Sequence, residues 1–213
     1  MTKDSGCFLC GPLTDRGGFV AVGSGIGVTG DLAPIQNGHA LLFHEEHYLS
    51  FSRVPDASMV VVKEACHTLS EYWGNRSRTS IFFEHGPLGG SGNFVGCCDH
   101  AHIHSLPVSD ELVASEGEVA HAISRRLHEE VGKGNVRSVD QISVDDLSNL
   151  KDIEYFWFSV DLNTLLVFEL LKPERQFMRR ITSQILGVET YRTWDMVDFS
   201  SAAQTTEIAK SLF

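Results

Sequence analysis

Three histidines at alternate positions constrain this chain more than any other feature. The segment Asp99-His-Ala-His-Ile-His-Ser-Leu-Pro107 carries imidazoles at His100, His102 and His104, with small or apolar residues between them. Successive side chains of a β-strand point to opposite faces of its sheet. A strand here would therefore place all three imidazoles on one face, where such a row can bind a metal ion, move protons or attack a phosphorus atom.

The composition is typical of a globular protein. The chain has 213 residues, of which 42% are hydrophobic, so it can bury a substantial core. No apolar run reaches the roughly 18 residues that a membrane span needs. The segment Met1–Gly6 lacks the apolar stretch of a signal peptide. We therefore expect a cytoplasmic location and no membrane partner.

The charge balance bears on the partners of the protein. There are 17 basic and 28 acidic residues, a net charge of −11. Proteins bind nucleic acid backbones by neutralising phosphates with Lys and Arg. We therefore expect no nucleic acid polymer as partner, and any nucleotide would be a small one held in a local pocket.

Two of the five cysteines form the pair Cys7-x-x-Cys10, directly before Gly11-Pro12. In a cytosolic protein this spacing indicates metal or redox chemistry before a structural disulfide. A thioredoxin-like redox pair would need a helix after it, which Gly11-Pro12 disfavours. The pair supplies half of a zinc site, so a metal role is favoured, and other roles stay open.

Hydrophobic periodicity predicts strands and one helix in the first half of the chain. Strands are expected at 18–22, 40–43 and 79–83, a loop or hairpin turn at 23–27, and a helix over 59–73. The apolar stripe of this helix indicates core packing, with Cys66 as a small buried residue and His67 off the stripe. The glycine-rich stretch after Gly86 could bring backbone N–H groups to an anion, although a plain connection would have the same composition.

The second half shows a helix over 110–132, a polar link over 132–149, strands over 153–160 and 164–171, and a helix over 174–186. Arg179 and Arg180 in the last helix are interpreted as surface charge. We expect two units, 1–109 and 110–213. The second either packs on the first and covers its site, or replaces a dimer partner, or is a stabilising extension.

Several of these blocks together resemble the histidine triad (HIT) superfamily of nucleotide hydrolases and transferases. The family has alternating histidines before apolar residues and often Pro, and an acidic residue eight positions before a Gly-His pair, as Asp31 stands before His39. The family's next apolar strand leads to a further histidine, here His47. The zinc-bearing branch begins with Cys-x-x-Cys. The resemblance covers about residues 7–108, and residues 176–195 are weakly similar to the C-terminal segment of larger HIT-like proteins.

The resemblance implies an α+β fold, with a HIT-like antiparallel sheet and a packed helix, followed here by a C-terminal α/β extension. It implies that His102 is the nucleophile and that His39 and His104 hold the phosphate. It implies that Asp31 accepts hydrogen bonds from the ribose hydroxyls. The implied ligands of a structural zinc ion are Cys7, Cys10, His47 and His100.

Departures from the family pattern affect the expected substrate site. The family's Ser five positions before the nucleophile is Cys97 here, which is a weak donor at best. The family's Asn-x-Gly is Glu84-His85-Gly86, and Glu84 would add negative charge near a phosphate, as an amine-bearing substrate would favour. We expect Glu84, Gly86 and Cys97 beside the substrate.

The expected function is a HIT-type nucleotidyl hydrolase or transferase. It would cleave a small nucleotide conjugate at the α-phosphate through a nucleotidyl-histidine, since a neutral imidazole is a competent nucleophile near neutral pH. Three alternatives remain: a phosphorylase-like nucleotidyltransferase, a nucleotide-binding protein with a degraded site, and a metalloprotein whose triad binds a catalytic metal. A homodimer is possible.

Overall fold

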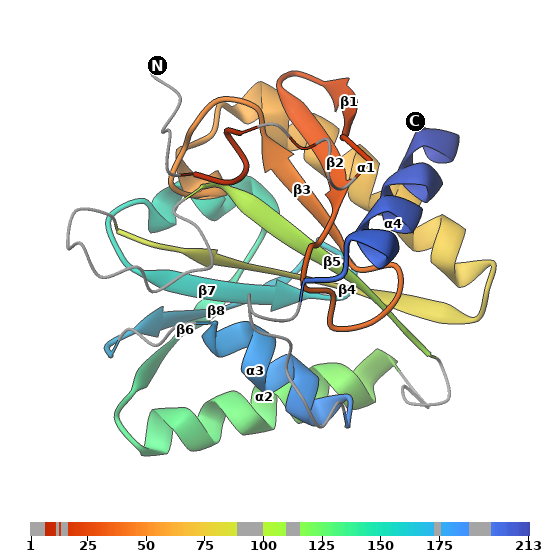
Figure 1. Ribbon diagram of the computed structural model, residues 1–213. Coiled ribbons are helices and arrows are strands. Elements are labelled where there is room, and N and C mark those ends of the chain that lie inside the picture. The colour runs from red at the N-terminus through yellow and green to blue at the C-terminus, as the bar shows by residue number, and fades with distance from the viewer. Residues whose placement is uncertain are drawn as a thin grey trace.

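The computed structural model describes residues 7–11, 13, 17–88, 100–109, 116–172, 176–187 and 197–213, with the backbone alone at 116–120 and 139–140. One eight-stranded antiparallel sheet, in the order β1-β2-β3-β5-β4-β7-β8-β6, forms its centre (Figure 1). The α+β prediction is confirmed. The strands are β1 (Val20–Gly23), β2 (Ile26–Gly30), β3 (Ala40–His44), β4 (Arg78–Gly86), β5 (His102–Ser109), β6 (Val136–Ile142), β7 (Tyr155–Ser159) and β8 (Leu165–Leu170).

A hairpin joins β1 and β2 through Ser24 and Gly25, which both have positive φ. The prediction of a turn here is confirmed, but the sequence analysis missed the strand β2 that follows. Glycines hid it, because they have low strand propensity. A Cβ at Gly27 would lie 2.8 Å from the ring of Phe19 and 2.9 Å from that of Phe43. Glycine in β2 therefore permits close packing of aromatic rings across the strand.

Helix α1 (Asp56–Gly74) packs on one face of the sheet, as the apolar stripe predicts. Its residues Val62 and Leu69 belong to the same core cluster as Phe82 of β4 and Ile103 of β5. Cys66 is buried and His67 is exposed, as expected. The predicted strands 40–43 and 79–83 correspond to β3 and β4.

The two halves of the chain share the sheet. Strand β7 pairs with β4 from Phe82–Ser159 to Gly86–Tyr155, and β8 and β6 extend the sheet further. The expected boundary after residue 109 falls at the end of β5, and the division into two units stays a prediction. The predicted polar link over 132–149 is wrong, because it contains β6 and a short 3₁₀ helix, η3 (Val144–Leu150). The apolar residues of β6 recur at every third position instead of alternating, so no strand pattern was visible, and within the described part of the chain β6 pairs only with β8.

Helices α2 (Glu116–Gly132) and α3 (Phe177–Ile185) cover the opposite face of the sheet, on the side of β7 and β8 (Figure 1). Helix α4 (Phe199–Leu212), which the sequence analysis did not predict, packs along β2. The backbone of Ala202 lies so close to Gly30 that a larger residue would collide there. The N–H of Gly30 donates to Thr206 Oγ1 at 2.9 Å, which fixes this crossing.

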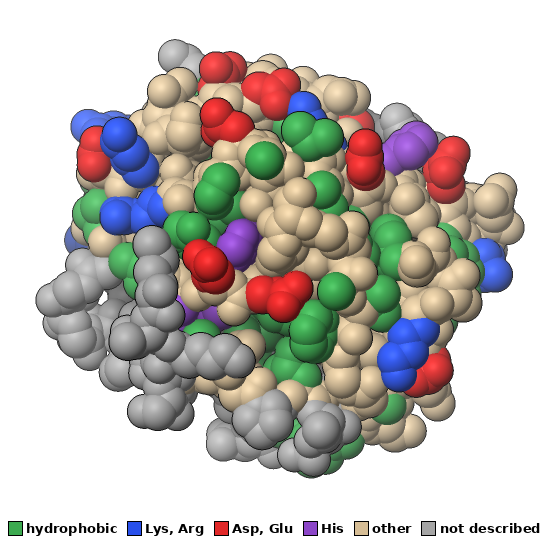
Figure 2. All heavy atoms as spheres, turned by 90° about the horizontal axis from the view of Figure 1, so that it is seen from above, with side chains coloured by type: hydrophobic (Ala, Val, Ile, Leu, Met, Phe, Trp, Pro, Cys, Tyr) green, Lys and Arg blue, Asp and Glu red, His purple; other side chains and the backbone are tan. Residues whose placement is uncertain are grey.

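Among the described residues, no helix is both long and apolar enough to pass through a lipid bilayer. Figure 2 shows one face of the molecule, on which acidic, basic and hydrophobic side chains are interspersed and histidines are visible between acidic groups.

Candidate functional site

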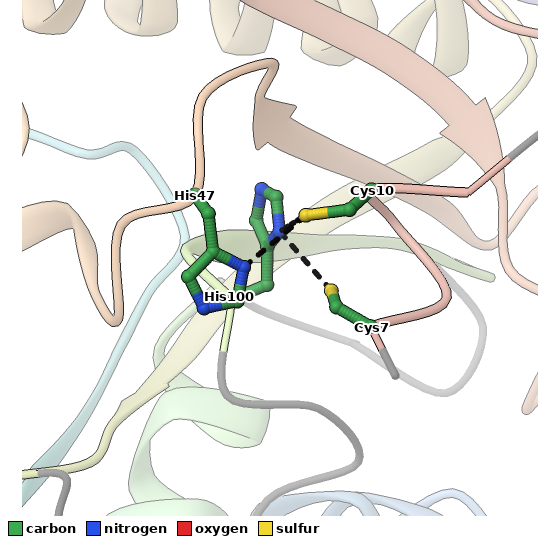
Figure 3. A group of neighbouring side chains, drawn as sticks. All are labelled: Cys7, Cys10, His47 and His100. Atoms are coloured by element: carbon green, nitrogen blue, oxygen red, sulfur yellow. Dashed lines mark hydrogen bonds between the residues drawn. The ribbon is translucent and has the colours of Figure 1, made fainter. Parts of the chain in front are cut away.

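Two thiols and two imidazoles converge beside the start of β5. Cys7 and Cys10 come from the N-terminal turn, His47 from the segment after β3, and His100 from two residues before β5. Their ligand atoms all lie within 4.8 Å of one another. Figure 3 shows the four side chains pointing toward one another, with Cys10 Sγ 3.2 Å from His47 Nδ1 and Cys7 Sγ 3.3 Å from His100 Nδ1. We name these four residues the Cys₂His₂ group.

The hydrogen bonds around the Cys₂His₂ group suit a metal ion. His100 Nε2 lies 2.5 Å from the carbonyl oxygen of His44 and donates to it. His100 Nδ1 therefore carries the lone pair, on the side of the two thiols. Metal-binding histidines generally donate their other ring N–H in this way. Two thiolates and two imidazoles are a donor set of closed, tetrahedral structural zinc sites, so these residues fit zinc.

His102 and His104 lie on β5, between β3 and β4, whereas His100 precedes this strand by two residues. His102 pairs with Phe43 across the sheet, and its Nδ1 lies 2.6 Å from the carbonyl oxygen of His100. A carbonyl oxygen can only accept, so Nδ1 carries the proton and Nε2 carries the lone pair of the neutral ring. An imidazole with this protonation pattern can act as a nucleophile through Nε2.

A second chain of hydrogen bonds sets the protonation of His39 and His104. The backbone N–H of Ile35 donates to His39 Nδ1 at 3.1 Å, so the proton of neutral His39 lies on Nε2. His39 Nε2 is 2.9 Å from His104 Nδ1 and donates to it. His104 consequently carries its proton on Nε2. Its ring centroid is 4.9 Å from that of His102, so an imidazole that donates through Nε2 stands next to one that carries its lone pair on Nε2.

Asp31 lies against both of these histidines. Its Oδ2 is 3.6 Å from His39 Nε2 and 3.5 Å from His104 Nδ1. The same oxygen accepts a hydrogen bond from Arg179 Nη1 of α3 at 2.5 Å. Burial by itself would raise the pKa of Asp31, but the adjacent guanidinium of Arg179, followed by the interactions with His39 and His104, holds that pKa well below its ordinary value. Asp31 is therefore an ionised carboxylate inside the protein.

The expectation that Arg179 is surface charge is wrong. Its side chain is only 5% exposed, and it also donates to the carbonyl oxygen of Ala33. A guanidinium presents several donors in a planar fork, which suits a carboxylate and a carbonyl at once. Residues 31 and 179 are far apart in the chain, so no local pattern could indicate the pairing.

The structure places Glu84 in the core rather than at a phosphate. Its carboxylate accepts hydrogen bonds from Phe51 N at 2.6 Å, Trp157 Nε1 at 2.8 Å and Tyr155 Oη at 3.0 Å. Burial raises the pKa of Glu84, and the three hydrogen bonds offset part of that rise. Glu84 belongs with residues of the α1 face, whereas Phe83 stacks on His104, because neighbouring side chains of β4 point to opposite faces. The geometry therefore does not support its expected role beside the substrate.

Gly86 and Cys97 are the other two residues that were expected beside the substrate. Gly86 ends β4, where a Cβ would collide with the ring of Tyr155. Glycine is thus needed there for packing, and a role for its N–H toward an anion stays a prediction. Cys97 lies outside the described residues.

His85 was not among the expected site residues. This residue shares a face of β4 with Phe83, whose ring is stacked on His104 at a centroid distance of 4.4 Å. Its Nε2 lies 3.2 Å from Glu154 Oε1, with both side chains mostly buried. Counting two residues along β4 from Phe83 would have placed His85 on the face of the histidine row.

No protein-family model and no curated protein matches the chain. Among solved structures, it is similar to a hypothetical histidine triad nucleotide-binding protein of Sulfolobus tokodaii, with 19% identity and a TM-score of 0.36 over 49% of this chain and 70% of that one. It is also similar to a Hit-like protein involved in cell-cycle regulation from Bartonella henselae, with 12% identity and a TM-score of 0.36 over 51% of this chain and 84% of that one. These likenesses are distant, so the function has to be inferred from the site itself.

Proposed function

We propose that the protein is a zinc-stabilised nucleotidyl hydrolase or transferase of the histidine triad type, acting on a small nucleotide conjugate. The observation that carries the proposal is the hydrogen bond from His102 Nδ1 to the carbonyl of His100. This hydrogen bond leaves the lone pair of His102 on Nε2. The neighbouring His104 carries a proton on its own Nε2. A nucleophile and a hydrogen-bond donor thus stand side by side on one face of the sheet.

The reaction has two displacements at the α-phosphorus. In the first, His102 Nε2 forms a bond to phosphorus while the bond to the leaving group breaks, and the leaving group departs with that electron pair and takes up a proton. In the second, a water oxygen bonds to phosphorus, its proton goes to solvent or a base, and the bond to His102 breaks. The products are a nucleoside monophosphate and the free leaving group. Covalent catalysis of this kind replaces one difficult step with two easier ones.

His104 stabilises the charge that develops on the phosphoryl oxygens, and His39 orients His104. His104 presents an Nε2–H donor because His39 donates to its other nitrogen. His39 is in turn fixed by the N–H of Ile35. Donors that are oriented before the reaction need no reorganisation in the transition state, which makes them effective. His39 is therefore a positioning residue, and His104 contacts the phosphate.

The Cys₂His₂ group is proposed to hold zinc in a structural role. Bound zinc contributes folding free energy and is not a reactant. Because His100 belongs to this group and its carbonyl accepts from His102, the group fixes the backbone that orients the nucleophile. The proposed partner is a small-molecule nucleotide, and a homodimer is compatible with the proposal.

The test is an intact-mass measurement of the full chain after rapid mixing with adenylyl conjugates that have amine, phosphate or ester leaving groups. We expect a transient mass increase of one adenylyl group, which peptide mapping places at His102. Absence of any adduct and of any nucleoside monophosphate would contradict the proposal. Adenosine monophosphate binding without turnover would instead indicate a nucleotide-binding protein.

The acceptor of the second step can be determined in the same assay. Product formation in buffer alone indicates a hydrolase, because water then resolves the intermediate. Product formation that requires added inorganic phosphate indicates the phosphorylase-like alternative. Metal analysis of His102→Ala tests the alternative of a metalloprotein whose triad binds a catalytic metal. A metal ion on the triad would be lost in this variant, whereas one on the Cys₂His₂ group would stay.

A further inference from the structure

The side chain of Arg179 connects the C-terminal half of the chain to the histidine site. Arg179 lies in α3, whereas Asp31 follows directly after β2. Both side chains are 5% exposed, and Nη1 of Arg179 is 2.5 Å from Oδ2 of Asp31. Removing one partner of such a buried pair leaves an uncompensated charge in the interior. The pair is therefore a fixed part of the site, supplied by both halves.

Both oxygens of Asp31 already have protein donors. Oδ1 accepts from the backbone N–H of Ala33 at 2.8 Å, and Oδ2 accepts from Arg179. Oδ2 also faces His39 and His104 at 3.6 Å and 3.5 Å. A sugar diol would have to displace Arg179 and reach a carboxylate that is almost completely buried. The geometry thus separates Asp31 from the ribose hydroxyls that the family resemblance would assign to it.

Arg179 also affects the charge around Asp31, His39 and His104. The carboxylate of Asp31 lies beside two imidazoles, and the guanidinium of Arg179 supplies the opposite charge at that carboxylate. The chain of hydrogen bonds from Ile35 through His39 to His104 runs next to this pair, with His39 Nε2 donating to His104 Nδ1. In this chain His104 donates through Nε2.

We infer that Asp31 and Arg179 form a positioning pair for His39 and His104, and that the enzyme consequently accepts ribonucleotide and 2′-deoxyribonucleotide conjugates alike. The inference rests on the proposed function and adds a substrate class to it. The ribose diol makes no contact with Asp31, so this carboxylate does not select for the 2′-hydroxyl. The C-terminal half is a required part of the site because it supplies Arg179.

The first experiment uses the unmodified full chain. Binding of AMP and of 2′-deoxy-AMP is measured by calorimetry, and cleavage of their p-nitrophenyl esters is followed in parallel. We expect the two dissociation constants, and the two values of kcat/KM, to differ by less than about threefold, since a lost hydrogen bond to a carboxylate would weaken binding about tenfold or more. Tenfold or greater preference for the ribose form would overturn the inference and leave the proposed function standing. Binding and cleavage of neither form would overturn both.

A second experiment tests the positioning role. Arg179→Met removes the cation while keeping an apolar stem, and Arg179→Lys keeps a positive charge without the planar fork. For Arg179→Met we expect kcat to fall about 100-fold, and the ribose form to become preferred about tenfold because Asp31 is released. Arg179→Lys should retain most of the kcat of the unmodified protein, and it should show no preference between the ribose and deoxyribose forms. A loss of kcat without any change in sugar preference in Arg179→Met, or failure of Lys to restore either property in a folded protein, would contradict the positioning role.

Discussion

The Nδ1 atom of His102 donates to the carbonyl oxygen of His100 across 2.6 Å, so the backbone of one histidine sets the reactive nitrogen of another. The side chain of His100 belongs to the Cys₂His₂ group, and its own Nε2 donates to His44 O. A residue with a structural side chain and an orienting carbonyl therefore links the proposed metal site to the proposed nucleophile. The relationship leads to separable predictions for the two sites.

Replacing His102 by Ala is expected to abolish turnover, by at least about 10³-fold, because the covalent step needs its Nε2 lone pair. Folding and zinc content should stay normal, since His102 is outside the Cys₂His₂ group. Steady-state kinetics, circular dichroism and metal analysis check these outcomes. The matched control is His67→Ala on α1, whose side chain is 73% exposed. Equal rates for the two variants would rule out His102 as the nucleophile.

Replacing Cys7 by Ser is expected to reduce the bound zinc to well below one ion per chain and to lower Tm by several degrees. A serine hydroxyl is a poor zinc ligand, and structural zinc contributes folding free energy. Elemental analysis and thermal unfolding measure the two effects. Cys66→Ala is the control, because Cys66 is buried in the core beneath α1, where burial raises the pKa of its thiol well above its ordinary value. Cys66→Ala should lower Tm while leaving the zinc content unchanged, and a drop in zinc for both variants would argue against a Cys₂His₂ site.

Replacing Asp31 by Asn is expected to lower the free energy of unfolding by about 3–5 kcal/mol at pH 7, because Arg179 is left without its counter-ion in the interior. The pKa of Asp31 is lower in the folded state than in the unfolded state. Its contribution to stability is therefore complete above the ordinary carboxyl pKa of about 4, and it declines as the pH falls further toward the folded-state value.

Urea unfolding of both proteins between pH 7 and pH 3 measures this effect. The difference between wild type and Asp31→Asn should shrink at the acid end of the range. Asp145→Asn, which removes an exposed ion pair with Lys63, should change the free energy by less than about 1 kcal/mol at any pH. A pH-independent difference for Asp31→Asn would mean that the carboxylate does not act through its charge.

Replacing Glu84 by Gln is expected to lower the free energy of unfolding by about 1–3 kcal/mol. The carboxylate accepts from the N–H groups of Phe51 and Trp157 on different oxygens. A Gln side chain has one oxygen and one NH₂ group, so one of these donors would face another donor. Urea unfolding measures the loss, and kcat per folded molecule should stay within about threefold of wild type because Glu84 lies on the α1 face. A much larger fall in kcat would return Glu84 to the substrate site.

Replacing Gly86 by Ala is expected to lower the free energy of unfolding by about 1–3 kcal/mol, because the new methyl group would overlap the ring of Tyr155. The control is Gly74→Ala at the end of α1, where nothing lies within 4 Å of the added carbon. That change should be neutral or stabilising by up to about 1 kcal/mol, since Ala is the better helix former. Urea unfolding of both variants provides the comparison, and equal losses would mean that the Tyr155 contact is not the cause.

Local patterns predicted most of the elements that carry the proposed site. Alternation of side chains indicated the histidine strand, helical spacing indicated α1, and the Cys-x-x-Cys pair indicated one corner of the Cys₂His₂ group. Each of these signals extends over fewer than 20 neighbouring residues. The four residues of the group could be joined only through the family resemblance, since His47 and His100 are distant in the chain.

The features that the sequence did not indicate depend on tertiary contacts. Strand β2 contains glycines that are explained only by the ring of Phe43 and the backbone of Ala202. Arg179 is directly followed by Arg180 in a helix, and two adjacent basic residues normally indicate a solvent-exposed face. Only its contact with Asp31 explains its burial. Glu84 was expected beside the substrate from the family resemblance, whereas alternation along β4 puts it on the face opposite to Phe83 and His104.

Strand β4 lies inside the sheet, with β5 along one side and β7 along the other. A polypeptide that stopped after Ser109 would leave the backbone groups of β4 from Phe82 to Gly86 without the partners that β7 provides. An unpaired edge of this kind is a template for strands of other chains. In a shortened polypeptide this edge would therefore be open to pairing with other chains.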